Sequence, residues 1–255
     1  MSKNLFIFDL DGTLIPPSSQ YPTSNTINTI KMASERNDVI IATARPRFGV
    51  FHILKEVEDK IYGFVFLNGA ITKFDNTLSY AKPFEEDFIS LILNLDIEID
   101  NLWLYSLNDW YVSNNNSSIY KRERKAVQKV GQLLEKYNFD LIYKIVIISK
   151  NTNNILDLIV DKNITTSFSN KNYLEITPEN INKLIGIKKI INKKSYKNIF
   201  SIGDSFNDIP FLEYSTYSCT IHNGHKKIKS IVDYVSDKKY ADGCIDCIEH
   251  IKSKF

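Results

Sequence analysis

The chain lacks the features that mark secreted and membrane proteins. It has three cysteines in 255 residues, at irregular spacing, which excludes a disulfide framework. No apolar run is long enough to cross a bilayer. The N-terminal apolar run Leu5–Phe8 meets Asp9 and Asp11 almost at once, unlike the core of a signal peptide. We therefore expect a cytoplasmic protein without a membrane partner.

The chain also has little net charge. Its 32 basic and 30 acidic residues leave a formal charge of +2, so there is no electrostatic case for a nucleic-acid partner. Hydrophobic residues make up 43% and charged residues 24%, which excludes disorder and is typical of a globular protein. These values leave a small molecule as the expected partner. Oligomeric state is not readable from the sequence.

Cys244 and Cys247 form the one Cys-x-x-Cys pair. The chain has no second such pair and no nearby histidine pair to complete a zinc site. We expect two small apolar side chains on one face of a terminal helix.

The two ends of the chain alternate apolar strands with helical segments. Short runs without polar residues are typical of strands buried on both faces, and their alternation with helices predicts a parallel sheet. The expected strands are 3–8, 39–42, 63–67, 198–202, 217–221 and 234–235. The expected helices are 24–36 (capped by Ser24 or Thr23), 48–57, 182–192 and one that starts at 208.

The middle of the chain has a different pattern. Two hairpins are expected, from strands 102–106 with 110–113 and 165–168 with 173–177, beside a strand at 144–149. Helices are expected at 85–95, 119–137 and 153–160. Hairpins and helices without parallel crossovers predict a separate α+β unit.

We therefore expect an α/β protein with a Rossmann-like parallel-sheet core and an inserted α+β cap domain. The core comprises residues 1–82 and 178–255, and the cap comprises residues 83–177.

Two carboxylates follow the first strand. Asp9 and Asp11 come directly after Leu5–Phe8, and such a pair repels by roughly 4 kcal/mol at an effective dielectric near 20. A surface turn would explain one acid and Gly12, but not an acid at the end of a buried strand, where ligands of α/β sheets collect. A hard cation such as Mg²⁺ would neutralise the pair.

A second acidic cluster follows the strand that ends at Ile202. Asp208 alone is explained by a helix cap, whereas Asp204 is not. Because both clusters lie at the same edge of the sheet, a shared metal is predicted. Thr43 follows the strand 39–42 and reaches that edge too, although taken alone it is a helix cap; Lys183, taken alone, is a solvated lysine.

These residues resemble the four motifs of the haloacid dehalogenase-like superfamily, in order. The motifs are DLDGT at 9–13, Thr43, Lys183 and GDSFND at 203–208. The chain is further similar to the Cof-type sugar-phosphatase branch, through Asn68-Gly69-Ala70, the α/β cap, Asn223-Gly224 with Lys229, and Asp242-Gly243. The resemblance spans the whole chain.

The resemblance implies a Mg²⁺-dependent phosphoric-monoester hydrolase. Asp9 is then the nucleophile that forms an aspartyl-phosphate, and Asp11 the general acid and base. Asp9, the main-chain carbonyl of Asp11 and Asp204 hold Mg²⁺, with Asp208 assisting through water. The residues expected to bind the substrate are Thr43, Arg45, Lys183 and Asn207.

The sequence departs from the family pattern in places. The usual Thr-Gly-Arg is Thr43-Ala44-Arg45 here, and Asn180-Ile181-Asn182 before the lysine is less glycine-rich than usual. Lys188 and Lys189 are therefore rivals of Lys183. Aromatic residues on hairpins are more often core, and basic residues on a helix are more often solvated, but the cap candidates for substrate contact are Trp103, Tyr105, Trp110, Lys121, Arg122 and Arg124.

Hydrolysis of small phosphorylated metabolites, sugar phosphates foremost, is the expected function. A sugar phosphomutase is the alternative enzyme, because some proteins with this cap type return the phosphoryl group to sugar. A non-catalytic sugar-phosphate-binding protein is the third hypothesis. Paired acids argue against it, because they are costly on an idle scaffold.

Overall fold

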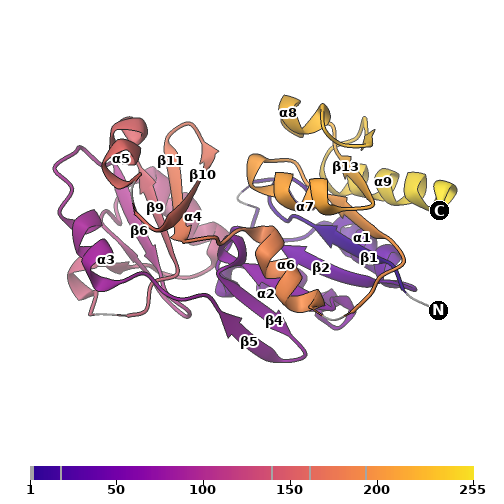
Figure 1. Cartoon of the computed structure of the whole chain (residues 1–255), viewed down its shortest axis with the longest axis horizontal. Coiled ribbons are helices and arrows are strands. Elements are labelled where there is room, and N and C mark those ends of the chain that lie inside the picture. The colour runs from indigo at the N-terminus through magenta and orange to yellow at the C-terminus, as the bar shows by residue number, and fades with distance from the viewer. Residues whose placement is uncertain (1–2, 18, 139, 161, 193) are drawn as a thin grey trace.

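The computed structural model describes residues 3–17, 19–138, 140–160, 162–192 and 194–255. The described residues form two sheets, in two lobes joined by two chain segments (Figure 1). The chain leaves the first lobe after β5 and returns to it at α6, so the second lobe is an insertion. The expected α/β core with an inserted α+β cap is thereby confirmed.

The core sheet has eight strands in the order β14-β13-β12-β1-β2-β3-β4-β5. The strands from β14 to β3 pair in parallel, and β4 and β5 add an antiparallel hairpin at the edge. Their bounds are β1 (Leu5–Phe8), β2 (Asp38–Ala42), β3 (Gly63–Phe66), β4 (Ile71–Phe74), β5 (Thr77–Tyr80), β12 (Ile199–Ile202), β13 (Tyr217–Thr220) and β14 (Tyr234–Val235).

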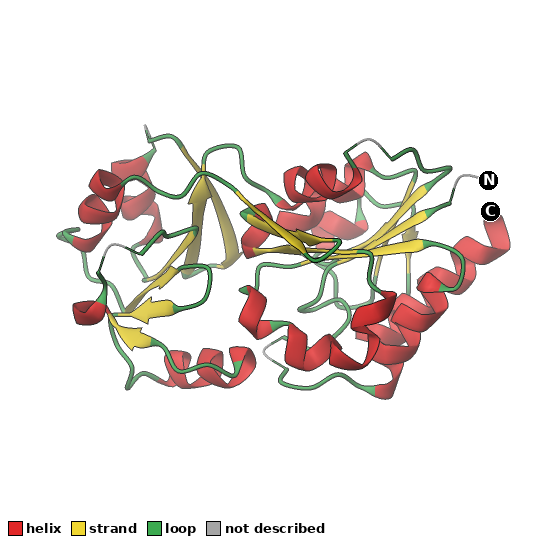
Figure 2. Cartoon of the chain, turned by 90° about the horizontal axis from the view of Figure 1, so that it is seen from below, coloured by secondary structure: helices red, strands yellow, loops and turns green. Residues whose placement is uncertain are grey.

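Helices cover both faces of the core sheet, as the view in Figure 2 shows. Alternate residues of β1 explain this arrangement, because successive side chains of a strand point to opposite faces. Leu5 and Ile7 pack in the cluster with α6 (Lys183–Ile191), α7 (Ile209–Tyr214) and α8 (Lys226–Lys229). Phe6 and Phe8 belong to the cluster with α1 (Ser24–Ser34) and α9 (Tyr240–Lys254). Both faces are therefore buried, as the wholly apolar strands predicted.

One helix cap and one pair of packing residues lie where the sequence placed them. Thr23 accepts from the backbone N–H of Thr26, and the Thr26 hydroxyl accepts from the N–H of Thr23, so α1 starts with a capping box. Cys244 and Cys247 are both buried on α9, as expected for apolar packing residues.

The single helix expected at 48–57 is wrong. The segment is three short pieces: a 3-10 turn Arg47–Gly49, α2 (Phe51–Leu54) and a second 3-10 helix Lys55–Lys60. The Gly49 carbonyl accepts a hydrogen bond from the Arg45 guanidinium at 3.1 Å, and the Ile53 N–H, which a continuous α-helix would direct to Gly49, donates to the Val50 carbonyl at 2.9 Å. The hairpin β4–β5 was not predicted either. Its turn residues Asp75 and Asn76 have φ of 46° and 58°, as a two-residue hairpin turn requires.

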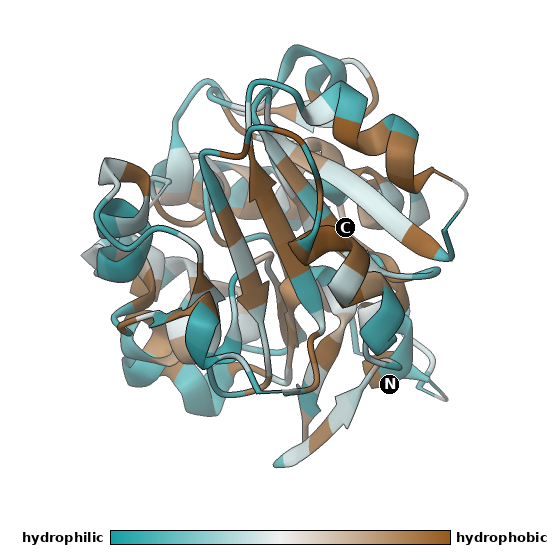
Figure 3. Ribbon diagram, turned by 90° about the vertical axis from the view of Figure 1, so that its left-hand side faces the viewer, coloured by the Kyte–Doolittle hydropathy of each residue, from teal (hydrophilic) through white to brown (hydrophobic). Residues whose placement is uncertain are grey.

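The cap sheet has the order β10-β11-β9-β6-β7-β8. Its strands are β6 (Asn101–Tyr105), β7 (Trp110–Val112), β8 (Gln132–Leu133), β9 (Lys144–Ile148), β10 (Ile164–Asn170) and β11 (Tyr173–Pro178), and its helices are α3 (Glu86–Leu93), α4 (Ser118–Val127) and α5 (Thr152–Ile159). Helices α3 and α5 pack on the face that carries Leu102, Leu104 and Ile145. The opposite face carries Trp103, Tyr105 and Val146 and is turned towards the core. Figure 3 views the cap side and shows hydrophobic and polar residues alternating along its strands.

The helix expected at 119–137 ends ten residues early, at Val127. Gln128 adopts the left-handed conformation (φ 52°, ψ 35°), which stops the helix. Gly131 then lies against the Trp110 ring, so close that a Cβ there would be 2.9 Å from it. The chain can therefore return as β8, which pairs in parallel with β7. The expectation of a cap without parallel crossovers is wrong at this point.

Candidate active site

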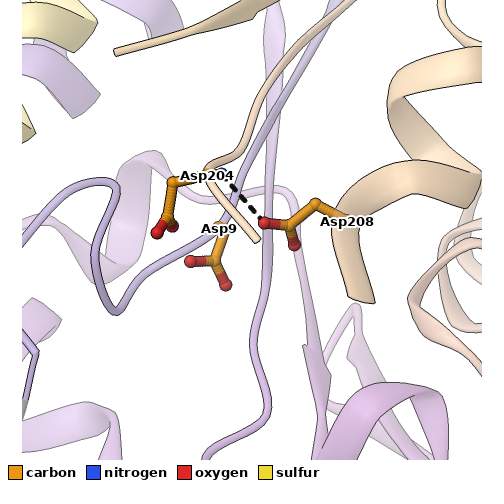
Figure 4. A group of neighbouring side chains, drawn as sticks. All are labelled: Asp9, Asp204 and Asp208. Carbon is orange, nitrogen blue, oxygen red and sulfur yellow. Dashed lines mark hydrogen bonds between the residues drawn. The ribbon is translucent and has the colours of Figure 1, made fainter. Parts of the chain in front are cut away.

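Three carboxylates converge at the carboxyl edge of the core sheet. Asp9 follows β1 and Asp204 follows β12, two strands that pair directly, and Asp208 lies four residues beyond. One oxygen from each lies within 4.8 Å of the others, and Figure 4 shows the three side chains side by side. The expected meeting of the first and fourth motifs is present in the structure.

The turn after β1 makes room for this cluster. Gly12 has φ of +89°, and a Cβ on it would lie 2.5 Å from Asp204 Oδ2. Thr13, the next residue, donates its hydroxyl hydrogen to Asp204 Oδ1 at 2.7 Å. The DLDGT segment therefore shapes the position of a carboxylate nearly two hundred residues away.

Lys183 is the cation of the cluster. It is the first residue of α6, behind the N-cap Asn182, and is 1% exposed. Its Nζ lies 2.5 Å from Asp9 Oδ1 and 2.7 Å from Asp208 Oδ1. The rivals Lys188 and Lys189 are exposed on the same helix. Of the three lysines, the structure brings Lys183 to the carboxylates.

Asp208 was expected to assist the metal through water, but its side chain is buried more deeply than this role needs. It is fully buried, and its Oδ2 accepts from the backbone N–H groups of Asp204 and Ser205 at 3.0 and 2.9 Å. Its Oδ1 accepts from Lys183. Both oxygens are thus engaged in holding the loop and the lysine.

Burial and mutual repulsion disfavour the ionised forms of these carboxylates. Burial raises the pKa of Asp9 well above its usual range, against the opposing charge of Lys183. Burial and the charge of Asp208 raise the pKa of Asp204 to about 7. A bound cation would relieve both effects, because it stabilises the ionised forms.

Thr43 and Asn207 line the same cavity as Asp9. Thr43 is buried directly after β2, and its hydroxyl accepts from the backbone N–H of Arg45 at 3.1 Å. Asn207 donates its amide N–H to Asn68 Oδ1 at 3.2 Å. Both residues therefore lie where the motifs predicted, beside the carboxylates.

Arg45 and Asp11 form an ion pair next to the cluster. The guanidinium contacts both carboxylate oxygens of Asp11, at 2.5 and 2.6 Å, and is 6% exposed. It also donates to the carbonyls of Ser19 and Ala126, at 2.9 and 2.8 Å. Arg45 lines the cavity, but its guanidinium is committed to Asp11 and to backbone carbonyls.

The cavity lies between the core and the cap and has a volume of about 290 Å³. Among the cap candidates, Trp103, Tyr105 and Arg122 line it. Trp110 is fully buried beneath Tyr105, while Lys121 and Arg124 lie on a separate exposed surface.

Sequence reasoning missed Glu123, Lys144 and Glu175, which also line the cavity. Lys144 Nζ contacts Glu175 Oε2 at 3.0 Å and donates to the Ala44 carbonyl at 3.1 Å. Glu175 accepts from the Asn68 amide at 2.6 Å. These bonds link cap strands β9 and β11 to the core loops that carry Ala44 and Asn68. The sequence marks Asn68-Gly69 as a motif, but no local pattern marks Lys144 or Glu175 in the cap.

The donor set suits a hard cation. The described members of the cluster offer carboxylate oxygens and no sulfur or imidazole ligand, and Asp9 and Asp204 line the cavity. The side chain of Asp11 is turned to Arg45, so only its main-chain carbonyl could contribute, as expected.

No helix in the described part of the chain is both long and apolar enough to span a membrane.

Comparison with known proteins agrees with the geometry. The family of haloacid dehalogenase-like hydrolases matches residues 6–248. A protein of Buchnera aphidicola subsp. Baizongia pistaciae, provisionally named a phosphatase, is 34% identical over 87% of each chain. A solved sugar phosphatase of haloacid dehalogenase subclass IIB superposes with a TM-score of 0.81 at 20% identity, over 98% of this chain and 99% of that one. A haloacid dehalogenase-like hydrolase from B. subtilis has a TM-score of 0.79 at 19% identity, over 97% and 99%. With its motifs assembled at one sheet edge and a family match over nearly its whole length, the chain belongs to the haloacid dehalogenase-like hydrolases.

Proposed function

We propose that this phosphatase hydrolyses small sugar phosphates with the help of one Mg²⁺ ion, through an aspartyl-phosphate on Asp9. The observation that carries the proposal is the convergence of Asp9, Asp204 and Lys183 at one sheet edge, where Asp9 and Asp204 line a cavity between the core and the cap. The sugar phosphatase of similar fold supports the substrate class.

Asp9 attacks phosphorus while Asp11 gives a proton to the leaving oxygen, so the ester bond breaks as the acyl-phosphate bond forms. Asp11 then takes a proton from a water that attacks phosphorus, and Asp9 is released with inorganic phosphate. Burial raises the pKa of Asp9, and the neighbouring charges of Lys183 and of a bound cation would favour the ionised form that attacks phosphorus. Thr43 and Asn207 are placed to contact phosphoryl oxygens, where hydrogen bonds stabilise charge in the transition state.

Mg²⁺ would be held by Asp9, Asp204 and the Asp11 carbonyl, and supplies positive charge beside the transferred phosphoryl group. Asp208 fixes the Asp204 loop through its two backbone hydrogen bonds. Arg45 orients the Asp11 carboxyl group through two hydrogen bonds, and one Asp11 oxygen must leave the guanidinium to carry and deliver the proton.

The test is release of phosphate from a panel of sugar phosphates and p-nitrophenyl phosphate, in Mg²⁺ and in EDTA. We expect activity in Mg²⁺, loss of it in EDTA, and at least a ~10³-fold fall in kcat for Asp9→Asn. Activity that survives EDTA or Asp9→Asn contradicts the proposal. Isomerised sugar phosphate with little free phosphate, stimulated by a bisphosphorylated sugar, would instead identify a mutase. Mg²⁺-dependent binding with unchanged substrate would identify a binding protein.

A further inference from the structure

The cavity beyond the carboxylate cluster carries charges of both signs. Its cations Arg45 and Lys144 are paired with Asp11 and Glu175. The described ion pairs include none for Glu123, which lines the cavity from the cap helix α4. Its Oε1 accepts a hydrogen bond from the Tyr105 hydroxyl at 3.3 Å. Glu123 is therefore a carboxylate that can accept further hydrogen bonds. It lines the same cavity as Asp9, in which a leaving group would lie.

The fold holds Glu123 in this position. The carbonyl of Ala126, three residues further along α4, accepts a hydrogen bond from the Arg45 guanidinium. This bond connects the last turn of the helix to the core. Residues three apart lie on the same side of a helix, which places Glu123 on the side that faces Arg45. Helix α4 is also anchored from within the cap, because the Tyr120 ring stacks on Trp110 at 5.5 Å.

Tyr105 is equally well fixed. It is 2% exposed, and its ring stacks on Trp110 at a centroid distance of 5.7 Å and an interplanar angle of 11°. Burial raises the pKa of Tyr105, with the Glu123 charge acting in the same direction. Burial also raises the pKa of Glu123, against the charge of Arg45. Hydrogen-bond donors from a ligand would replace the water that this carboxylate has lost.

We propose that Glu123 and Tyr105 form the leaving-group subsite, and that they bind hydroxyl groups of a neutral polyol such as a sugar or sugar alcohol monophosphate. This inference rests on the proposed phosphatase function. A second carboxylate on the substrate would be repelled by Glu123, and the cations Arg45 and Lys144 cannot offset this repulsion because each is already paired with an acid. Hydroxyl groups can donate to the acid and accept from the cations. The Trp103 ring, which also lines the cavity, offers an apolar surface to the C–H groups of such a ligand.

The wild-type protein provides the first test. Initial rates in Mg²⁺ are compared for glucose 6-phosphate, sorbitol 6-phosphate and phosphoglycolate. We expect kcat/KM for the better polyol ester to exceed that for phosphoglycolate by about tenfold or more, because one charged hydrogen bond has this magnitude. The reverse order overturns the inference. It leaves the phosphatase function standing, since that depends on Asp9 and on EDTA sensitivity.

Variants provide the second test, read as the ratio of kcat/KM for the polyol ester to that for p-nitrophenyl phosphate, which has no hydroxyl on its leaving group. Glu123→Gln should lower this ratio by about 10- to 100-fold and Tyr105→Phe by about 3- to 10-fold. Lys125→Gln, at an exposed position of the same helix, is the matched control and should leave the ratio unchanged. A ratio unchanged in both cavity variants contradicts the subsite. If Glu123→Gln does not fold, as judged by circular dichroism, Tyr105→Phe alone decides.

Discussion

Arg45 donates two hydrogen bonds to the carboxylate of Asp11, from Nε to Oδ2 at 2.5 Å and from Nη2 to Oδ1 at 2.6 Å. The same guanidinium donates from Nη1 to the carbonyl of Ala126, in the cap helix α4. The residue expected to contact substrate therefore connects the proposed general acid with the cap. Through Arg45, the direction of the acid depends on how the cap lies on the core.

Arg45→Lys should lower kcat by about 10- to 100-fold with a smaller change in KM, because an ammonium group cannot hold a carboxylate at two points. Steady-state kinetics on the best substrate of the panel measures this split. Arg47→Lys is the control, since Arg47 reaches only Asn108 across an exposed contact. An equal change in both variants, or a change in KM alone, would argue against a positioning role.

Mg²⁺ should stabilise the protein more at high pH than at low pH. The folded-state pKa of Asp204, about 7, lies above its ordinary value of 3.8, so the folded metal-free protein binds more protons than the unfolded chain between these values. Its stability must then fall as the pH rises from about 4 to about 7. Thermal unfolding in EDTA and in Mg²⁺ at pH 5.5 and pH 8 measures the effect. We expect the Mg²⁺-induced rise in Tm to be larger at pH 8 by roughly 3 °C or more.

Asp204→Asn is the control in EDTA, because it removes the titrating carboxylate while keeping its shape and no metal is bound there. The variant should show a smaller difference between the two pH values. A Mg²⁺ effect of equal size at both pH values in the wild type would contradict the prediction.

Lys183→Met should destabilise the metal-free protein by about 3–5 kcal/mol, because it leaves Asp9 and Asp208 buried without their cation. Urea unfolding at pH 8 gives the free energy of unfolding. Lys188→Met, on the exposed side of the same helix, should change it by no more than about 0.5 kcal/mol. Equal losses in the two variants would show that the buried pairing contributes little.

The ion pair of Lys144 with Glu175 should be strongly coupled. Each single change, Lys144→Met or Glu175→Leu, leaves a nearly buried charge without its partner and should cost about 3 kcal/mol. The double variant should lose less than the sum of the two by at least ~1 kcal/mol. A double-mutant cycle by urea unfolding measures this coupling, and additive losses would mean that the two charges act independently.

Local sequence determined the core of the fold and the position of the carboxylates that follow its strands. The core strands are so apolar that only burial on both faces suits them, and Asp9 and Asp204 follow two of them directly, so their convergence follows from the parallel order. The Cys244–Cys247 face followed from helix periodicity, and Thr23 was one of the two N-cap candidates, with Ser24, that capping preference offered. Such features depend on neighbouring residues and on the periods of strand and helix.

Only the tertiary structure decided the rest, because it depends on surfaces that meet across long stretches of chain. Helix α4 ends at Val127, where Gln128 adopts the left-handed conformation, and Gly131 beyond it packs against Trp110; the glycine by itself did not place this end. Glu123, Lys144 and Glu175 have no spacing that distinguishes them from other charged residues of the cap, and their significance arises when the cap sheet faces the core. The sequence places Arg45 at the sheet edge. That its guanidinium pairs with Asp11 follows from the short distance between the two charges in the folded chain.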